Sequence, residues 1–337
     1  MASLGKSGLP VSEIGLGLAA IGRPGYINLG RDRDLGADRS VEAMRRRAHD
    51  VLDAAYAGGV RYFDAARSYG LAEDFLASWL DARAFGPGDV TVGSKWGYRY
   101  TADWQVGATV NEIKDHSVAN LRRQAAESRG LLGDRLRLYQ IHSATLESGV
   151  LGDPEVLAEL SSLAAAGLAI GLSVSGPRQS DVIRRALEVR VDGRPLFASV
   201  QATWNLLEPS AGPALAEAKA AGWGVIVKEA LANGRLATFP PPAALAAPGS
   251  PASRARPWPL ESVAGRLHCA ADAVAIAAAL AQPWSDVILS GAVSPEQLAG
   301  NLAAVDVRIS PDDLAELASM AEPPASYWAT RAALAWA

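Results

Sequence analysis

The sequence predicts an α/β protein that folds as a (β/α)8 TIM barrel. Eight short apolar runs occur along the chain, and a helical pattern of apolar residues follows each of them. Polar side chains stand at or just beyond the ends of most of these runs, as at Asp64, Lys95 and His142. The expected strands cover about 13–17, 61–64, 90–95, 136–141, 169–173, 198–202, 224–227 and 286–289.

An open, doubly wound sheet is the alternative architecture, and it would normally carry a glycine fingerprint after its first strand. The stretch from Gly15 to Gly22 is glycine-rich, but its third glycine comes two residues too late for G-x-G-x-x-G. A closed barrel is therefore favoured, and a length of 337 residues suits one barrel domain over residues 1–337.

Local signals predict the remaining elements. Glycine and proline punctuation in Leu4–Leu18 predicts an N-terminal β-hairpin that leads into the first strand. Asp38 or Ser40 can cap the first helix, and Asp153 can cap the helix that begins at residue 154. Residues 23–39 and 233–260 predict long loops, and 305–337 predict a C-terminal helix and a tail over the active-site face. The expected helices cover about 41–55, 71–84, 107–129, 154–166, 177–189, 210–221, 261–268, 270–281, 295–304 and 306–321.

Composition narrows the class of protein. A net charge of −4 and a pI of about 5.7 imply no basic face for nucleic acid. The only cysteine is Cys269, which excludes an intrachain disulfide framework and favours a reducing compartment. The N-terminus lacks an apolar core of signal-peptide length, and the longest apolar run falls far short of the ~20 residues of a membrane span. We expect a cytoplasmic protein that acts on a small molecule, as a monomer or weak homo-oligomer.

Four titratable side chains are expected to meet at one face of the barrel. Asp64, Lys95 and His142 end the second, third and fourth strands, and Tyr69 follows Asp64 by five residues. The carboxyl ends of barrel strands converge on the face where active sites are built. Each residue alone has an ordinary interpretation, such as a solvated lysine or a packed tyrosine. Their occurrence on three consecutive strands makes coincidence much less plausible.

These side chains suit proton transfer at a carbonyl. Asp64 would keep Lys95 charged, and a charged lysine beside Tyr69 would lower the pKa of the phenol from about 10 toward neutrality. Tyr69 could then act as a general acid or base, while His142 donates a hydrogen bond to a substrate oxygen. The four groups supply no hydride and no nucleophile, and we expect no metal, so a redox cofactor is required.

The segments that carry these residues resemble the aldo-keto reductases over nearly the full chain. The matching segments are 61–70, 93–95, 139–142, 171–173, 290–298 and 301–302. The resemblance implies a (β/α)8 barrel with NADP(H) or NAD(H) extended across its C-terminal face. It also implies Tyr69 as the proton donor, Lys95 and Asp64 as its tuning pair, and His142 as the residue that orients the carbonyl.

The same resemblance implies cofactor contacts. Ser173 and Gln201 would lie near the carboxamide, and a loop that begins at Lys228 would pass beside the pyrophosphate. The residues expected around the adenosine end are Ser290, Gly291, Ser294, Gln297 and Asn301. A helix that opens at Ser294 also offers free backbone N–H groups to a phosphate, a property compatible with an ordinary N-cap role for Ser294.

One departure from the family pattern bears on the cofactor. Members that prefer NADP usually carry a cation after the eighth strand, whereas Gly291–Ser294 contains none. A phosphate dianion favours charge-assisted donors, so we expect NAD(H) to be accepted or even preferred. Arg235, Arg254 or Arg256 in the long loop could supply the missing charge.

We expect the loop after the first strand and the C-terminal tail to form the substrate-binding part of the active site. The candidate residues are Tyr26, Asn28, Trp96, Trp328 and Arg331. Packing on the outer helices is the alternative for Trp328 and Trp336. The tail and the tolerance of NAD are most similar to the bacterial and plant sugar dehydrogenases, which oxidise aldoses to lactones.

We therefore predict an NAD(P)(H)-dependent oxidoreductase that interconverts an aldehyde, ketone or aldose/lactone carbonyl and an alcohol by hydride transfer. One alternative is a non-catalytic, nicotinamide-binding redox sensor subunit, although a pure binder has no need of all four side chains. A second alternative is an aldolase that uses Lys95 or Lys228 as a Schiff-base amine. Such an amine must be neutral to attack, whereas Asp64 would keep Lys95 charged.

Overall fold

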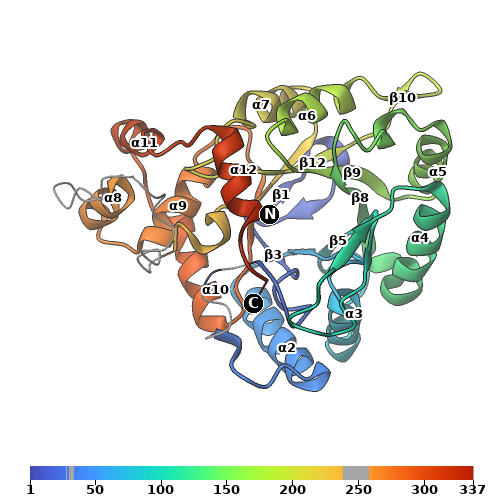
Figure 1. The fold of residues 1–337 in the computed structure, drawn as a ribbon, viewed down its shortest axis with the longest axis horizontal. Helices are drawn as coiled ribbons and strands as arrows, with labels where there is room; N and C mark the ends of the chain where they lie inside the picture. The colour runs from blue at the N-terminus through green and yellow to red at the C-terminus, as the bar shows by residue number, and fades with distance from the viewer. Residues whose placement is uncertain (28, 30–33, 238–257, 337) are drawn as a thin grey trace.

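The computed structural model describes residues 1–27, 29, 34–237 and 258–336. Eight parallel strands close into a barrel, each pairing with the next along the chain, and the last pairs with the first (Figure 1). The predicted fold class is thereby confirmed. The barrel strands are β3 (Ile14–Gly17), β4 (Tyr62–Asp64), β5 (Thr91–Trp96), β8 (Leu136–Ala144), β9 (Ala169–Val174), β12 (Ser199–Thr203), β13 (Gly224–Lys228) and β14 (Val287–Ser290).

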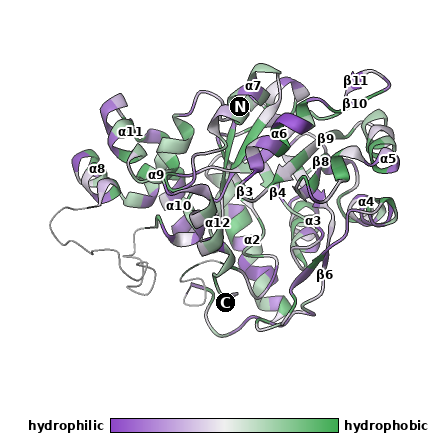
Figure 2. Ribbon diagram, turned by 45° about the horizontal axis from the view of Figure 1, so that its top comes forward, coloured by the Kyte–Doolittle hydropathy of each residue, from purple (hydrophilic) through white to green (hydrophobic). Residues whose placement is uncertain are grey.

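Helices surround the barrel, and most of them pack apolar residues against the strands. Figure 2 shows hydrophobic and hydrophilic residues alternating along the outer helices, as expected for elements buried on one side only. The helices are α2 (Val41–Ala57), α3 (Ala72–Ala82), α4 (Val118–Leu132), α5 (Pro154–Ala165), α6 (Gln179–Leu187), α7 (Gly212–Ala220), α8 (Pro259–Leu267), α9 (Ala271–Leu280), α10 (Pro295–Leu302), α11 (Pro311–Ala318) and α12 (Pro324–Ala332). Short 3-10 turns cover Gly5–Ser7, Gly133–Arg135, Val150–Gly152, Ala232–Gly234 and Ala303–Asp306.

The predicted caps hold the starts of several helices. The Ser40 side chain accepts a hydrogen bond from Ala43 N at the start of α2, and Asp153 accepts two at the start of α5. Ser294 accepts from Gln297 N at the start of α10. Satisfying these otherwise unpaired N–H groups fixes where each helix begins.

The N-terminal hairpin predicted from the sequence is present and closes one end of the barrel. Strand β1 (Ala2–Ser3) pairs with β2 (Pro10–Val11), and the intervening Leu4 and Leu9 pack with Tyr62, Leu138, Ile226 and Val287. A second small hairpin joins β10 (Arg190–Val191) to β11 (Arg194–Pro195).

The prediction of a helix over 107–129 is wrong for its first half. Residues 98–114 instead form an antiparallel hairpin in which β6 (Tyr98–Tyr100) pairs with β7 (Glu112–Lys114). Helix α4 begins only at Val118, because the Ser117 side chain caps it by accepting from Asn120 N. This hairpin places Glu112 close to the active-site face, as described below.

The C-terminal tail is more helical than expected. Helix α11 occupies only the second part of the stretch predicted as 306–321, and the tail itself forms α12. Asn205 Nδ2, which follows β12, donates to Tyr327 Oη at 3.0 Å and holds α12 to the barrel. In Figure 1, α12 lies across the central part of the fold and leads to a C-terminus near α10.

Within the described ranges, no individual helix is both long and apolar enough to cross a membrane, although α8 and α9, which are bent by 92°, meet the criteria as a pair.

Candidate active site

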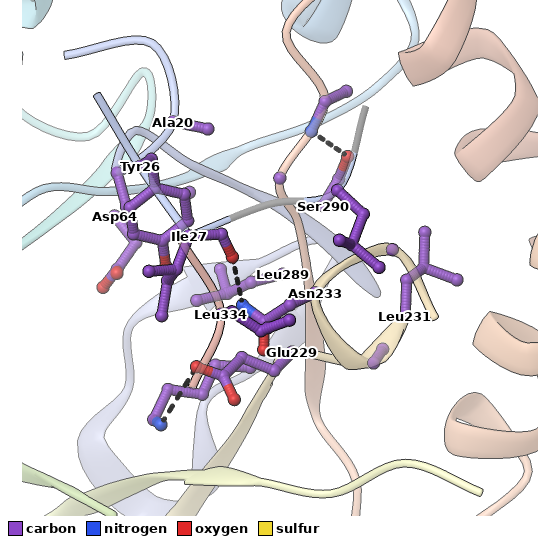
Figure 3. A pocket seen from close by; sticks show the side chains of 18 of the residues that line it. Ala20, Tyr26, Ile27, Asp64, Glu229, Leu231, Asn233, Leu289, Ser290 and Leu334 are labelled. Atoms are coloured by element: carbon purple, nitrogen blue, oxygen red, sulfur yellow. Dashed lines mark hydrogen bonds and ion pairs between the residues drawn. The ribbon is translucent and has the colours of Figure 1, made fainter. Parts of the chain in front are cut away.

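A cavity of about 890 Å³ lies at the carboxyl ends of the barrel strands. Its lining includes Asp64, Ser173 and Gln201 from the strands, together with residues of the loops after β3, β13 and β14. Figure 3 shows Tyr26 and Asp64 on one side of this cavity and Ser290 and Leu231 on the other. The position agrees with the general placement of active sites in such barrels.

Asp64 and Lys95 form a buried ion pair beneath the cavity. The ammonium of Lys95 donates to Asp64 Oδ2 and to the carbonyl of Ala65, and neither charged side chain exposes more than 2% of its surface. Oδ1 of the same carboxylate accepts from Tyr62 Oη, Gln140 Nε2 and Gln201 Nε2 at 3.0–3.2 Å. A charge pair withdrawn from water needs this many partners to be tolerated.

A glycine in β5 makes room for one of these partners. A Cβ at Gly93 would lie 2.5 Å from Tyr62 Oη, the hydroxyl that donates to Asp64. The absence of a side chain at Gly93 therefore lets Tyr62 approach the carboxylate.

Tyr69 and His142 meet at the cavity wall. Tyr69 Oη lies 3.4 Å from His142 Nε2, and their rings pack edge to face with centroids 5.3 Å apart. His142 Nδ1 lies 3.3 Å from Ser68 Oγ, which can donate to it. With its proton on Nε2, the imidazole can then donate toward the same point as the phenol. Lys95 Nζ is 4.9 Å from the centre of the Tyr69 ring, so the four predicted side chains do lie together.

The pKa of Tyr69 is shifted in a direction that differs from the expectation. Burial and the charge of Asp64 raise the pKa of Tyr69 well above its usual value, whereas Arg23 lowers it. This direction is opposite to the predicted lowering toward neutrality, because burial of the phenol and the nearby charge of Asp64 both oppose its ionisation. Burial, followed by the charges of Lys95 and Arg23, lowers the pKa of His142 well below its usual value. The site accordingly holds a protonated phenol beside a neutral imidazole.

Residues expected near a carboxamide line the middle of the cavity. Ser173 Oγ accepts a hydrogen bond from Ser143 N at 2.8 Å, and Gln201 Nε2 donates to Asp64. Lys228 Nζ donates to Thr203 Oγ1 at 2.8 Å and lies 4.0 Å from Glu229 Oε1. Burial lowers the pKa of Lys228 to about 8, although Glu229 opposes this shift. Lys228 is therefore a cation that titrates close to physiological pH.

Residues expected at the adenosine end form a polar group after β14. Ser290 Oγ accepts from Asn301 Nδ2 at 2.8 Å and from Ala292 N at 3.2 Å. Gln297 Oε1 accepts from Val293 N, and its Nε2 donates to Asp34 Oδ2 at 2.6 Å. Ser290, Gly291, Gln297 and Asn301 line the cavity, whereas Ser294 caps α10 and does not contact it.

The expected substrate residues divide into two groups. Tyr26 and Arg331 line the cavity. Trp96 does not, because it is fully buried at the end of β5, and Trp328 packs among residues of α8, α9 and α11. These two expectations are corrected accordingly. Asn28 lies outside the described residues, as do Arg254 and Arg256 of the long loop.

Several charged residues at the cavity were not identified from the sequence. Glu229 accepts from Arg331 Nε at 2.9 and 3.0 Å. Burial opposes ionisation of this carboxyl, but Arg331 and Lys228 lower the pKa of Glu229 to about 2. Arg23 and Glu112 form a second ion pair beside Tyr69. The strand-end position of Glu229, directly after Lys228, is the one signal in the sequence, whereas the residues around Glu112 carry a pattern typical of a helix.

Comparison with known proteins agrees with the resemblance found in the sequence. The profile of the Aldo/keto reductase family matches residues 13–322. The chain belongs to this family. Membership supports an NAD(P)-dependent carbonyl or alcohol oxidoreductase in general terms. No curated protein matches the sequence significantly.

Solved structures of aldo-keto reductases share the barrel. Aldo-keto reductase AKR11C1 from Bacillus halodurans, in its holo form, is 22% identical with a TM-score of 0.70, and the match covers 96% of both chains. A candidate aldo-keto reductase from Pseudomonas aeruginosa is 25% identical with a TM-score of 0.62, over 90% of this chain and 92% of that one. These similarities describe the fold of this aldo-keto reductase.

Proposed function

We propose that this aldo-keto reductase interconverts a carbonyl and an alcohol by hydride transfer, with Tyr69 as the general acid and base. The observation that carries the proposal is the convergence of Tyr69 Oη and His142 Nε2, 3.4 Å apart, on the wall of a large cavity. The buried pair of Lys95 and Asp64 lies beside them, with Lys95 Nζ 4.9 Å from the centre of the Tyr69 ring. This arrangement can bind, polarise and protonate one substrate oxygen.

Each side chain has a separate task in carbonyl reduction. A carbonyl oxygen placed between Tyr69 and His142 accepts a hydrogen bond from each, which polarises the C=O bond. Tyr69 keeps its proton at neutral pH because its pKa is raised, and it releases that proton to the oxygen as negative charge develops there. The neutral His142 orients the oxygen without taking part in the proton transfer.

The residues present fit a nicotinamide dinucleotide. The cavity extends from Tyr69 to the group formed by Ser290, Gln297 and Asn301, whose amides and hydroxyls suit ribose and adenine. Ser173 and Gln201 would hold the carboxamide, and Lys228 would contribute positive charge near the phosphates. When bound, the nicotinamide supplies or accepts the hydride.

We propose that NAD(H) is preferred over NADP(H). The cavity near Ser290 and Asn301 carries two carboxylates, from Asp34 and Asp272, and the described lining residues there include no Lys or Arg. A carboxylate accepts hydrogen bonds from ribose hydroxyls but repels a 2′-phosphate. Arg235 is already paired with Glu322, which leaves it poorly placed to compensate.

The cofactor preference can be measured by binding alone. We expect ADP-ribose to bind more tightly than its 2′-phosphorylated form in calorimetry, and NADH more tightly than NADPH. A clear preference for the phosphorylated ligands would overturn this part of the proposal and leave the role of Tyr69 untouched.

For the substrate we propose a polyhydroxylated carbonyl compound, as in the sugar dehydrogenases. The outer part of the cavity combines charges of both signs with aromatic rings. The ion pair of Arg331 and Glu229 offers acceptors and donors to hydroxyl groups, and the rings of Tyr26 and Trp336 pack at 6.0 Å beside it. Turnover of aldoses with NAD, and weak turnover of apolar aldehydes, is the expected result.

Turnover of any carbonyl or alcohol separates this function from its alternatives. Nicotinamide absorbance with a panel of aldehydes, ketones and sugars measures it directly. Tight cofactor binding without turnover across the panel would support a redox sensor instead. Lys95 is held as a charged pair with Asp64, so an aldolase would depend on Lys228, and borohydride trapping of a carbonyl on Lys228 would reveal one. A cytoplasmic enzyme that is a monomer or a weak homo-oligomer stays our prediction.

A further inference from the structure

A buried arginine from the loop after β3 contacts the tyrosine proposed as the acid and base. Arg23 is 2% exposed, and its guanidinium carbon lies 5.0 Å from the centre of the Tyr69 ring. Its Nη1 donates to the carbonyl of Ser68 at 3.1 Å, and its Nε donates to the carbonyl of Ala19. Arg23 therefore contacts both the backbone directly before Tyr69 and the face of the tyrosine ring.

One charged partner of Arg23 comes from outside the barrel strands. Arg23 Nη1 also donates to Glu112 Oε2 at 3.0 Å, and Glu112 belongs to the β6–β7 hairpin. The rings of Tyr26 and Trp336 lie 4.9 and 4.7 Å from the guanidinium carbon. A buried cation is tolerated only with such partners, and stacking on rings suits a guanidinium. Among the described residues, the loop after β3, the segment before Tyr69, the β6–β7 hairpin and the C-terminal tail thus hold this arginine in place.

Other charged groups also face Tyr69, from several elements of the barrel. Lys95 on β5 is neutralised by Asp64 on β4, and His142 on β8 is an uncharged imidazole. Glu229 after β13 is paired with Arg331 from α12. Lys228 on β13 lines the same cavity, and Asp64 and Glu229 both raise the pKa of Tyr69. Among the described residues, Arg23 is a cation stacked on the phenol ring, and Glu112 is a carboxylate paired with it. The pKa of Tyr69 responds accordingly, since Arg23 lowers it and Glu112 raises it.

We propose that Arg23 is a positioning residue that holds Tyr69 in place and stabilises its ionised form, and that Glu112 sets the strength of this effect. The proposal rests on the function proposed above for Tyr69. It predicts that the two charges act on the same proton with opposite signs. A purely structural role for the ion pair would make the two substitutions alike.

Alcohol oxidation provides the test, because it requires the tyrosinate, so its kcat/KM rises with pH over the range below the pKa of Tyr69. We expect Arg23→Met to displace this rise to higher pH by about one unit or more, which lowers kcat/KM about tenfold at a fixed pH, since an opposite charge at this range shifts a pKa by that amount. Glu112→Gln should move it to lower pH by a smaller amount. Arg23→Lys, which keeps the charge, should lie between Arg23→Met and wild type.

Tyrosinate absorbance of the cofactor-free protein gives a second measurement, with Tyr69→Phe subtracted to isolate one phenol. It should show the same opposed shifts. The ion pair of Arg184 and Glu217 between α6 and α7 is a matched control, and Arg184→Met and Glu217→Gln should shift neither profile. Shifts of the same sign in Arg23→Met and Glu112→Gln, or no shift in either, would overturn the inference. Full activity of Tyr69→Phe would instead overturn the proposed function.

Discussion

Removing the charge of Asp64 should destabilise the protein more than removing any surface carboxylate. In Asp64→Asn, the Lys95 ammonium loses its counter-charge in a site from which water is excluded, with the carbonyl of Ala65 as its remaining acceptor at 3.0 Å. The new amide group would also face side chains that now donate to the carboxylate, among them Gln201. Two unfavourable effects therefore act together. The buried ammonium lacks a counter-charge, and the new amide faces other hydrogen-bond donors.

The expected loss in the free energy of unfolding follows from the burial of both Asp64 and Lys95. Breaking a fully buried ion pair by removing one charge costs about 3–5 kcal/mol. An unfolding entropy of about 2.1 cal/mol/K per residue over this chain converts 4 kcal/mol into a fall in Tm of about 6 °C. Asp81→Asn is the matched control, because Asp81 pairs with Arg135 at 2.6 Å on the surface. Such an exposed pair contributes at most about 1 kcal/mol.

Thermal and urea unfolding of the two variants measure this difference. Adding Lys95→Met to Asp64→Asn should recover part of the lost stability, because no uncompensated charge then remains in the site. Equal unfolding free energies for Asp64→Asn and Asp81→Asn would refute the reasoning. The reasoning would also be refuted if the double variant lost more free energy of unfolding than the two single variants lose together.

Three further predictions concern ligands. Asp34→Ala should weaken NAD binding about tenfold, the value of one charge-assisted hydrogen bond, and should narrow the preference over NADP in calorimetry; unchanged affinities would remove Asp34 from the site. Because burial lowers the pKa of Lys228 to about 8, cofactor affinity should fall as pH rises through 8 in wild type and stay level in Lys228→Met. Arg331→Ala should raise KM for polyhydroxylated or anionic substrates, because Glu229 loses its bidentate partner, and should spare small neutral aldehydes; equal effects on both classes would argue against this role.

The barrel could be predicted because its signals are local. Each strand is a short apolar run beside turn residues, and the caps Ser40, Asp153 and Ser294 mark helix starts through side chains adjacent in sequence. The convergence of Asp64, Lys95 and His142 followed from one general property, that strand ends meet at one face. The β6–β7 hairpin was missed because its short strands carry a polar pattern that resembles a solvated helix.

Long-range charge pairing could not be predicted in the same way. Nothing near Arg23 in the sequence indicates that Glu112 lies against it, or that Arg331 reaches Glu229 from the last helix. The direction of the pKa shift of Tyr69 also depends on features that the sequence does not display, namely burial of the phenol and the charges of Glu112 and Glu229. Similarly, Trp96 was placed near the substrate by its position after Lys95, but the pleat of β5 directs it into the core.

The most direct test of the proposed function compares wild type with Tyr69→Phe in two measurements, cofactor binding by calorimetry and turnover by nicotinamide absorbance. The phenylalanine keeps the ring that packs against His142 and Arg23 and removes only the hydroxyl. We predict unchanged cofactor affinity and a fall in kcat of about 10²–10⁴-fold, the usual contribution of general acid–base catalysis. Turnover that persists at the wild-type rate in Tyr69→Phe would contradict the role of Tyr69 on which this function rests.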